Sequence, residues 1–208
     1  MSRVASAIAL CFALSGAVIT VGASATLSKQ QADAFQRKLD VITKQGDVLS
    51  RQHVSRDRAD VRRTPINETE LNSWFTYRAQ PLLPAGVASP QITIVGNGKL
   101  MGNVVVDVGA IAKKHSSGGT FDPFSYLGGR VPVTVSGTLQ TSGGQGRFDV
   151  ESADVSGVPV PKPLLQEILS YYSRTPEHPS GIRLDDAFEL PASIQKIEVG
   201  QGQAVIVQ

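Results

Sequence analysis

Apolar and polar residues follow three different patterns along this chain. Residues 4–21 are almost entirely apolar and carry no charge. From residue 27 to residue 44, apolar side chains recur at helical spacing, and the stripe is narrow, which predicts a helix that is peripheral or that pairs with another element. Beyond residue 64 apolar and polar residues alternate, as they do in strands that bury one face. We therefore expect a β-rich globular domain at 64–208 and a peripheral helix followed by a basic tether at 26–63.

The helical stripe near the start consists of Phe35, Leu39 and Ile42, and Gly46 is expected to end this helix. The residues from 47 to 63 are polar and show no clear period. They therefore predict a tether without regular structure.

A helix of the globular domain is predicted around Trp74, the only tryptophan of the chain. Asn67 and Glu70 have the three-residue spacing of a capping box, which begins a helix. Leu71, Trp74 and Phe75 then fall on one side of it. A tryptophan buries a large apolar area, so Trp74 is predicted to anchor the core.

Strict alternation predicts an antiparallel sheet in the rest of the domain. Asn97-Gly98 between two alternating segments is a strong hairpin signal. The apolar residues switch from even to odd positions around Glu151-Ser152, which predicts a β-bulge there. The predicted strands lie at 91–94, 100–108, 131–136, 148–155, 194–199 and 204–207.

A second helix is predicted between Pro161 and Tyr172, with a wide apolar stripe that should cover the buried face of the sheet. The predicted fold is therefore α+β: a twisted antiparallel sheet packed on one or two helices, preceded by a signal peptide and an N-terminal helix.

The first 25 residues have the organisation of a secretory signal peptide. Arg3 is the only charge before Lys29, and Ala23 and Ala25 supply the small residues that a signal peptidase needs. Cleavage after Ala25 would place a chain without cysteine in the periplasm or outside the cell. The alternative is an uncleaved anchor, since the apolar run could cross ~30 Å of hydrocarbon and leave the domain outside the membrane.

Charge is distributed unevenly along the chain, whose formal net charge is +2. Residues 26–63 hold nine Lys or Arg against five Asp or Glu. Few aromatic residues accompany them to stack on bases, so nucleic acid is not expected as a partner. Either this stretch is a solvated linker, or it rests on anionic lipid headgroups. The basic residues in question are Arg51, Arg56, Arg58, Arg62 and Arg63.

The segment 113–130 is rich in glycine and serine but carries four large apolar side chains: Phe121, Phe124, Tyr126 and Leu127. Loops usually expose their residues, so these side chains need a place to be buried. The loop either packs back onto the core or forms a gating loop over an apolar cavity.

No catalytic or metal-binding motif is present. His53, His115 and His178 each lack a second ligand at metal spacing. Asp185-Asp186 is an adjacent acidic pair, but neighbours on an extended chain point in opposite directions, which favours a surface turn. We therefore expect no catalytic residues, no metal and no cofactor, and a protein that is not an enzyme.

Residues 66–208 resemble small bacterial exported relatives of the tubular lipid-binding (TULIP) superfamily. The resemblance rests on Thr69-Glu70-Leu71-Asn72, on the strand pairs, and on the ending Phe188-Glu189-Leu190-Pro191 followed by the two strands within 197–207. It implies a long twisted antiparallel sheet that wraps a helix, a lipid-binding groove, and no catalytic residues.

The expected function is therefore an exported, non-enzymatic protein that binds lipid or another apolar ligand in a sheet–helix groove, with a role in envelope lipid transport. Each buried methylene group contributes ~0.8 kcal/mol, so a lining of aliphatic residues suffices. The same residues would form an ordinary core if no cavity exists. The alternative function is an interaction module that docks an envelope protein through the 121–127 loop or a sheet edge. The expected lining residues are Leu71, Phe75, Val104, Val106, Val133, Val135, Leu165, Ile168 and Leu169.

Overall fold

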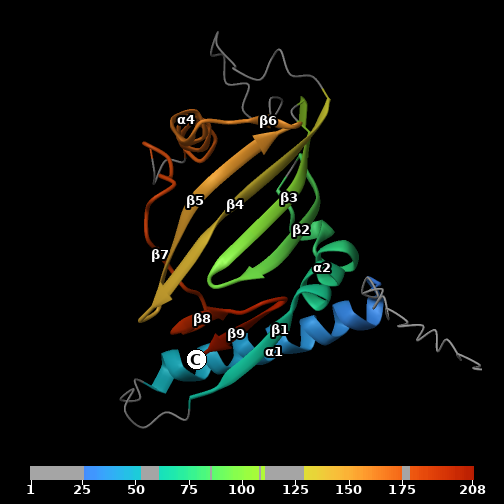
Figure 1. Ribbon diagram of the computed structural model, residues 1–208. Helices are drawn as coiled ribbons and strands as arrows, with labels where there is room; N and C mark the ends of the chain where they lie inside the picture. Colours follow the sequence, from blue (N-terminus) through green and yellow to red (C-terminus); the bar gives the residue numbers. More distant parts are fainter. Residues whose placement is uncertain (1–25, 53–60, 85, 108, 111–128, 175–178) are drawn as a thin grey trace, which may run out of the picture.

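The computed structural model describes residues 26–52, 61–84, 86–107, 109–110, 129–174 and 179–208 (Figure 1). The predicted signal peptide and the four residues of the predicted gating loop lie outside the described residues. So do Arg56, Arg58 and the three histidines.

The chain forms two antiparallel sheets with helices beside them, so the predicted α+β class is confirmed. The larger sheet has the order β2-β3-β4-β5-β6, and β7 pairs with the other end of β5. The smaller sheet has the order β1-β9-β8. The larger sheet contains β2 (Val87–Gly96), β3 (Lys99–Asp107), β4 (Arg130–Ser142), β5 (Gln145–Val155), β6 (Val158–Pro159) and β7 (Phe188–Glu189). The smaller sheet contains β1 (Arg63–Asn67), β8 (Lys196–Val199) and β9 (Gln203–Val207).

The described helical segments are α1 (Lys29–Gln52), α2 (Glu68–Tyr77), the 3-10 turn η2 (Gln80–Leu82) and α4 (Lys162–Tyr172). In Figure 1, α1 runs beneath the smaller sheet, α2 lies beside β2, and α4 lies near β6 at the opposite edge of the larger sheet.

The helix α1 differs from its prediction in length. It does not end at Gly46 but continues to Gln52, so the first part of the predicted tether is helical. Gly46 instead lets α1 pass close to the backbone of Ala192. A Cβ on it would lie 2.5 Å from the Cα and carbonyl oxygen of Ala192. Of the two alternatives for this helix, pairing with another part of the chain describes it better, because Phe35 and Ile42 are only 7% and 4% exposed.

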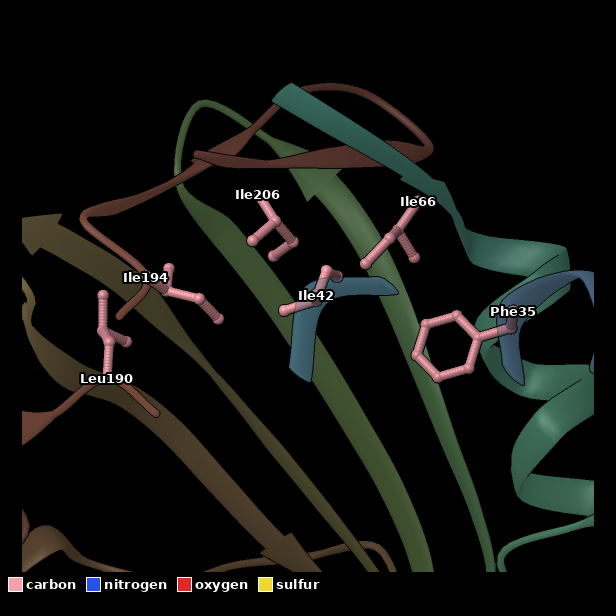
Figure 2. Packing of buried hydrophobic residues seen from close by; sticks show 6 residues of the cluster. All are labelled: Phe35, Ile42, Ile66, Leu190, Ile194 and Ile206. Atoms are coloured by element: carbon pink, nitrogen blue, oxygen red, sulfur yellow. The ribbon is translucent and has the colours of Figure 1, made fainter. Parts of the chain in front are cut away.

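The main core lies between α1 and the smaller sheet (Figure 2). Phe35 and Ile42 come from α1, and Ile66 comes from β1. The remaining buried members of this cluster are Leu190, Ile194 and Ile206, from the chain between β7 and β8 and from β9. The core therefore joins residues from both ends of the described chain.

Trp74 anchors this core as predicted. It packs against the buried cluster, with its ring centroid 5.4 Å from that of Phe35. Its indole Nε1 donates to Oε1 of Gln36 at 2.7 Å, so the polar end of the ring has a partner. Trp74 thus attaches α2 to α1.

The predicted capping box at the start of α2 is confirmed. The backbone N–H of Glu70 donates to Oδ1 of Asn67 at 2.7 Å, and the Glu70 side chain accepts from the backbone of Asn67. Glu70 also accepts from Nζ of Lys38 at 2.6 Å, which ties α2 to α1 a second time.

Local signals in the strands are also confirmed. Asn97 and Gly98 have φ values of 54° and 82°, as a type I′ turn between β2 and β3 requires. On β5, Ser152 pairs with Ser136 and Val150 pairs with Gly137, so Glu151 is the extra residue of a bulge. The final hairpin forms as well, but it belongs to the smaller sheet, whereas a single sheet was predicted.

Side-chain and backbone hydrogen bonds join the two sheets at a corner. The Thr141 hydroxyl donates to the carbonyl oxygen of Ile197 at 2.9 Å and accepts from its N–H at 2.8 Å. The N–H of Gly98 donates to the carbonyl oxygen of Val199 at 3.3 Å. These bonds hold the smaller sheet against the end of β4 and the turn between β2 and β3.

Candidate functional site: the apolar face of the larger sheet

The register of the larger sheet gathers its apolar side chains on one face. Val104 pairs with Val133, and Val106 pairs with Val131. Val135 pairs with Ala153 on the next strand. Since paired residues point to the same side of a sheet, these side chains form one surface across β3, β4 and β5. The surface, here called the inner face, consists of Ile92, Ile94, Leu100, Val104, Val106, Val131, Val133, Val135, Leu139, Phe148, Val150, Ala153 and Val155.

The opposite, outer face carries a network of polar side chains. Glu151 accepts from Lys99 and from Thr138, both at 2.8 Å, so these three residues connect β3, β4 and β5. Hydrogen bonds from Lys99 and Thr138 favour the charged carboxylate and lower the pKa of Glu151 below its usual value. Thr134 likewise donates to Asn103 at 2.8 Å. The outer face is therefore the more polar of the two and is suited to contact with water.

The inner face is not buried uniformly. Ile94, Val131 and Ala153 are buried, whereas the four predicted strand residues Val104, Val106, Val133 and Val135 are only partly buried among the described residues. None of these four belongs to the buried cluster beside α1. Sequence alternation therefore assigned these four valines to one face correctly, and the structure leaves them partly exposed.

The predicted residues of α2 lie at the edge of the sheet. Leu71 packs against the core cluster, and Phe75 contacts Trp74 with ring centroids 5.6 Å apart. The helix itself packs along β2. These two residues are therefore separated from the central valines by the width of β2.

The predicted residues of α4 lie at the other edge. Leu165, Ile168 and Leu169 are partly buried, and the neighbouring Leu164 is 47% exposed. Among the described elements, α4 packs chiefly on β5. α4 was expected to partner the buried face of the sheet; its contacts place it at the β5 edge, and in Figure 1 it lies beside β5, near β6.

The β2 edge of the sheet is closed by polar side chains of α2. Asn72 donates to the carbonyl oxygen of Ile92 and accepts from its N–H, both at 2.8 Å. Glu68 accepts from the N–H of Ile94 at 2.7 Å, and the N–H of Gly202 donates to the Ile94 carbonyl at 2.8 Å. Sequence analysis missed this role, although Glu68 and Asn72 share one side of α2, four residues apart.

Comparison with family models, curated proteins and solved structures finds no match. The TULIP resemblance therefore stays a prediction. Within the described part of the chain, no helix is both long and apolar enough to cross a bilayer.

The acidic pair Asp185-Asp186 forms a surface turn, as predicted. Asp185 accepts from Nζ of Lys162 at 2.9 Å, and this bond lowers the pKa of the Asp185 carboxyl. Asp186 instead pairs with Arg183, at 3.9 Å. The two carboxylates thus have different cations and do not converge. Among the described residues, no three His, Cys, Asp or Glu side chains gather in a way that could hold a metal.

The basic stretch is described in part only. Arg62 is exposed, and Arg63 forms an ion pair with Glu198 across the smaller sheet. That pairing lowers the pKa of the Glu198 carboxyl. Arg51 lies in the last turn of α1. Arg63 is therefore part of a strand, and its side chain has a partner within the fold.

Proposed function

We propose that this chain is an exported, non-enzymatic protein that binds an apolar ligand, with a lipid acyl chain as the best fit, on the inner face of the larger sheet. The observation that carries this proposal is the group of partly buried valines at 104, 106, 133 and 135. The proposal that the protein is exported rests on the apolar first 25 residues.

The packing of the inner face supports a guest of this kind. Protein interiors are normally close-packed, and burying the remaining exposed area of these apolar side chains under a ligand is favourable. Each methylene group that moves from water onto the face contributes ~0.8 kcal/mol, so a chain of several methylenes binds without any polar contact. The outer face offers a smaller gain, because it carries fewer apolar side chains, Met101 and Val105 among them, and its polar side chains are hydrogen-bonded to one another.

The position of the helices gives the site its boundaries. In Figure 1, α2 flanks β2 and α4 lies near β6, while the strands between them carry the valines. A ligand on the inner face would therefore contact β3 and β4 in the centre. Phe75 and Leu165 would lie at the edges of the site.

Native mass spectrometry of the full chain, purified from its own membranes, tests the proposal. We expect co-purified lipid with the wild-type chain and with Val105→Asn, whose side chain lies on the outer face. Val104→Asn, one residue away but on the inner face, should lose most of the lipid because it places an amide among the valines. Lipid-free wild-type protein would contradict the proposal, as would equal lipid loss in both variants.

A second candidate function, the docking of an envelope protein, is favoured by one observation at the opposite edge of the sheet. Along the edge that faces away from β4, β5 pairs with β7 at 145–146 and with β6 at 154–155. Residues 147–152 have no strand partner on that side within the described part of the chain. An extended peptide could add to this edge. The bulge at Glu151 and the charges of Arg147 and Asp149 oppose such pairing, so this candidate ranks second.

A photoreactive amino acid at position 147 separates the two functions. Docking at the β5 edge should give a single cross-linked protein in intact cells, and a probe at Lys99 on the outer face should not. Lipid binding alone predicts no specific protein adduct at either position.

A further inference from the structure

The C-terminal end of α2 holds the residues that lead into α1. The Tyr77 hydroxyl donates to the carbonyl oxygen of Leu27 at 3.4 Å. The N–H of Ser28 donates to the hydroxyl oxygen of Ser73, a fully buried residue, at 3.2 Å. Figure 1 shows the first turn of α1 beside α2. The fold therefore fixes the point at which residues 1–25 join it.

Apolar side chains are exposed at this same end of α2. Tyr77 is 42% exposed, and Leu82 is 72% exposed, the highest value for a large apolar residue in the described part of the chain. Leu82 belongs to η2, where its N–H donates to the carbonyl oxygen of Ala79 at 2.8 Å and Pro81 restricts the backbone. A closed, stiff turn thus presents Leu82 to the surroundings.

The charges beside these residues favour an anionic partner. Lys29, in the first turn of α1, is exposed, and that turn contains no acidic residue. Asp33, in the next turn, forms an ion pair with Arg78, which compensates its charge. Exposed leucine and tyrosine beside a lysine are the residue types that suit the interface of an anionic membrane.

The sequence that precedes Thr26 brings a membrane to this surface. Residues 4–21 are apolar and uncharged, and as a helix they would extend ~27 Å, close to the ~30 Å of a hydrocarbon core. Residues 22–25 can span at most ~14 Å when extended. While the apolar segment occupies a bilayer, either before cleavage after Ala25 or permanently, the end of α2 must therefore lie close to the lipid headgroups.

We propose that Lys29, Tyr77 and Leu82 form a surface that docks on a lipid bilayer. Leu82 enters the boundary between headgroups and acyl chains, Tyr77 lies at the level of the headgroups, and Lys29 contacts lipid phosphates. The inference rests on the proposed targeting of residues 1–25 to a membrane, but not on ligand binding at the inner face.

Nitroxide lipids that quench fluorescence near the headgroups test the docking. The full chain with Cys11→Ser and Gln80→Cys carries a fluorophore at the exposed position 80 and is reconstituted in vesicles of phosphatidylcholine and phosphatidylglycerol. We expect strong quenching at position 80. A fluorophore introduced by Val158→Cys should be quenched little, because β6 lies at the opposite edge of the larger sheet.

A charge at position 82 separates docking from mere proximity to the apolar segment. Leu82→Asp should remove most of the quenching at position 80, because a carboxylate does not enter the acyl boundary. Val158→Asp places the same charge at another exposed apolar position and should leave that quenching unchanged. Equal quenching at position 80 with and without Leu82→Asp would overturn the proposal.

A fluorophore on the native Cys11, with nitroxides placed deep in the acyl chains, tests the membrane targeting separately. We expect strong quenching there. Quenching at Cys11 without quenching at position 80 would refute the docking and leave the targeting intact. An unquenched Cys11 would contradict the targeting and, with it, the docking that rests on it.

Discussion

The side-chain amide of Asn72 forms two hydrogen bonds with the backbone of Ile92, one to its N–H and one to its carbonyl oxygen, each 2.8 Å long. A neighbouring strand would make the same two bonds. Asn72 therefore ends the sheet at β2 in place of a further strand, which protects this edge from pairing with other chains.

Replacing Asn72 with Ala should lower the free energy of unfolding by about 2 kcal/mol, because two backbone groups lose their partners. Urea denaturation measures the change. Asn72→Asp keeps the acceptor for the Ile92 N–H but loses the donor, so its loss should lie between those of Ala and wild type. Thr76→Ala, exposed on the same helix, is the control and should change little; a similar loss there would contradict the special role of Asn72.

The capping box at Asn67 makes a second prediction. Asn67→Ala removes the acceptor for the Glu70 N–H and should cost about 1 kcal/mol of stability, the usual value of an N-cap. Asn67→Ser keeps a capping oxygen and should recover most of this loss. Thermal unfolding followed by circular dichroism gives the comparison, and equal melting of the Ala and Ser variants would count against the cap.

Replacing Gly46 with Ala should lower the free energy of unfolding, although helix propensity alone predicts an increase. In an exposed helix, Gly→Ala stabilises by roughly 1 kcal/mol. Here the new methyl group would meet the backbone of Ala192, so Gly46→Ala should destabilise by about 1–3 kcal/mol. Asp47→Ala, at the exposed neighbouring position, should show the ordinary propensity gain. A stabilised Gly46→Ala variant would mean that α1 and the Ala192 turn do not touch.

Glu151 makes the stability dependent on pH. Its pKa is lowered from 4.5 by the hydrogen bonds from Lys99 and Thr138, so the unfolded chain binds the proton more tightly than the folded one. The stabilisation is therefore fully present above pH 4.5 and is lost as the pH falls through the pKa of the folded state.

Glu151→Gln should accordingly be less stable than wild type at neutral pH, and the difference should shrink in acid. The difference is small, since exposed ion pairs are screened by water. Urea denaturation of both proteins at neutral pH and at a pH below 4.5 measures the difference, and Glu167→Gln on α4 is the control. A difference that does not change with pH would contradict this role of the carboxylate.

Features that depend on neighbouring residues were predictable from sequence. The Asn97-Gly98 turn, the capping box of Asn67 and the bulge at Glu151 each follow from a few adjacent side chains. Alternation also placed Val104 and Val133 on one face, because the period of a strand is fixed by its backbone.

Features that depend on distant residues were not predictable in this way. The strand β1 was missed because Pro65 interrupts its five residues, and its identity as a strand comes from pairing with β9. Gly46 was assigned as a helix end because its close contact, Ala192, lies far away in the sequence. The side-chain amide of Gln208 donates to the carbonyl oxygen of Ile42 on α1, and no local pattern could indicate a contact between residues so far apart in the sequence.

The pairing of β1 with β9 also has a consequence for how the protein matures. Phe35 and Ile42 are made early on the ribosome, and Ile66 and Trp74 follow soon, but the part of the core at positions 190–206 is made much later. The nascent chain must therefore carry a partly uncovered apolar helix until the β8–β9 hairpin has emerged, and only then can the core close.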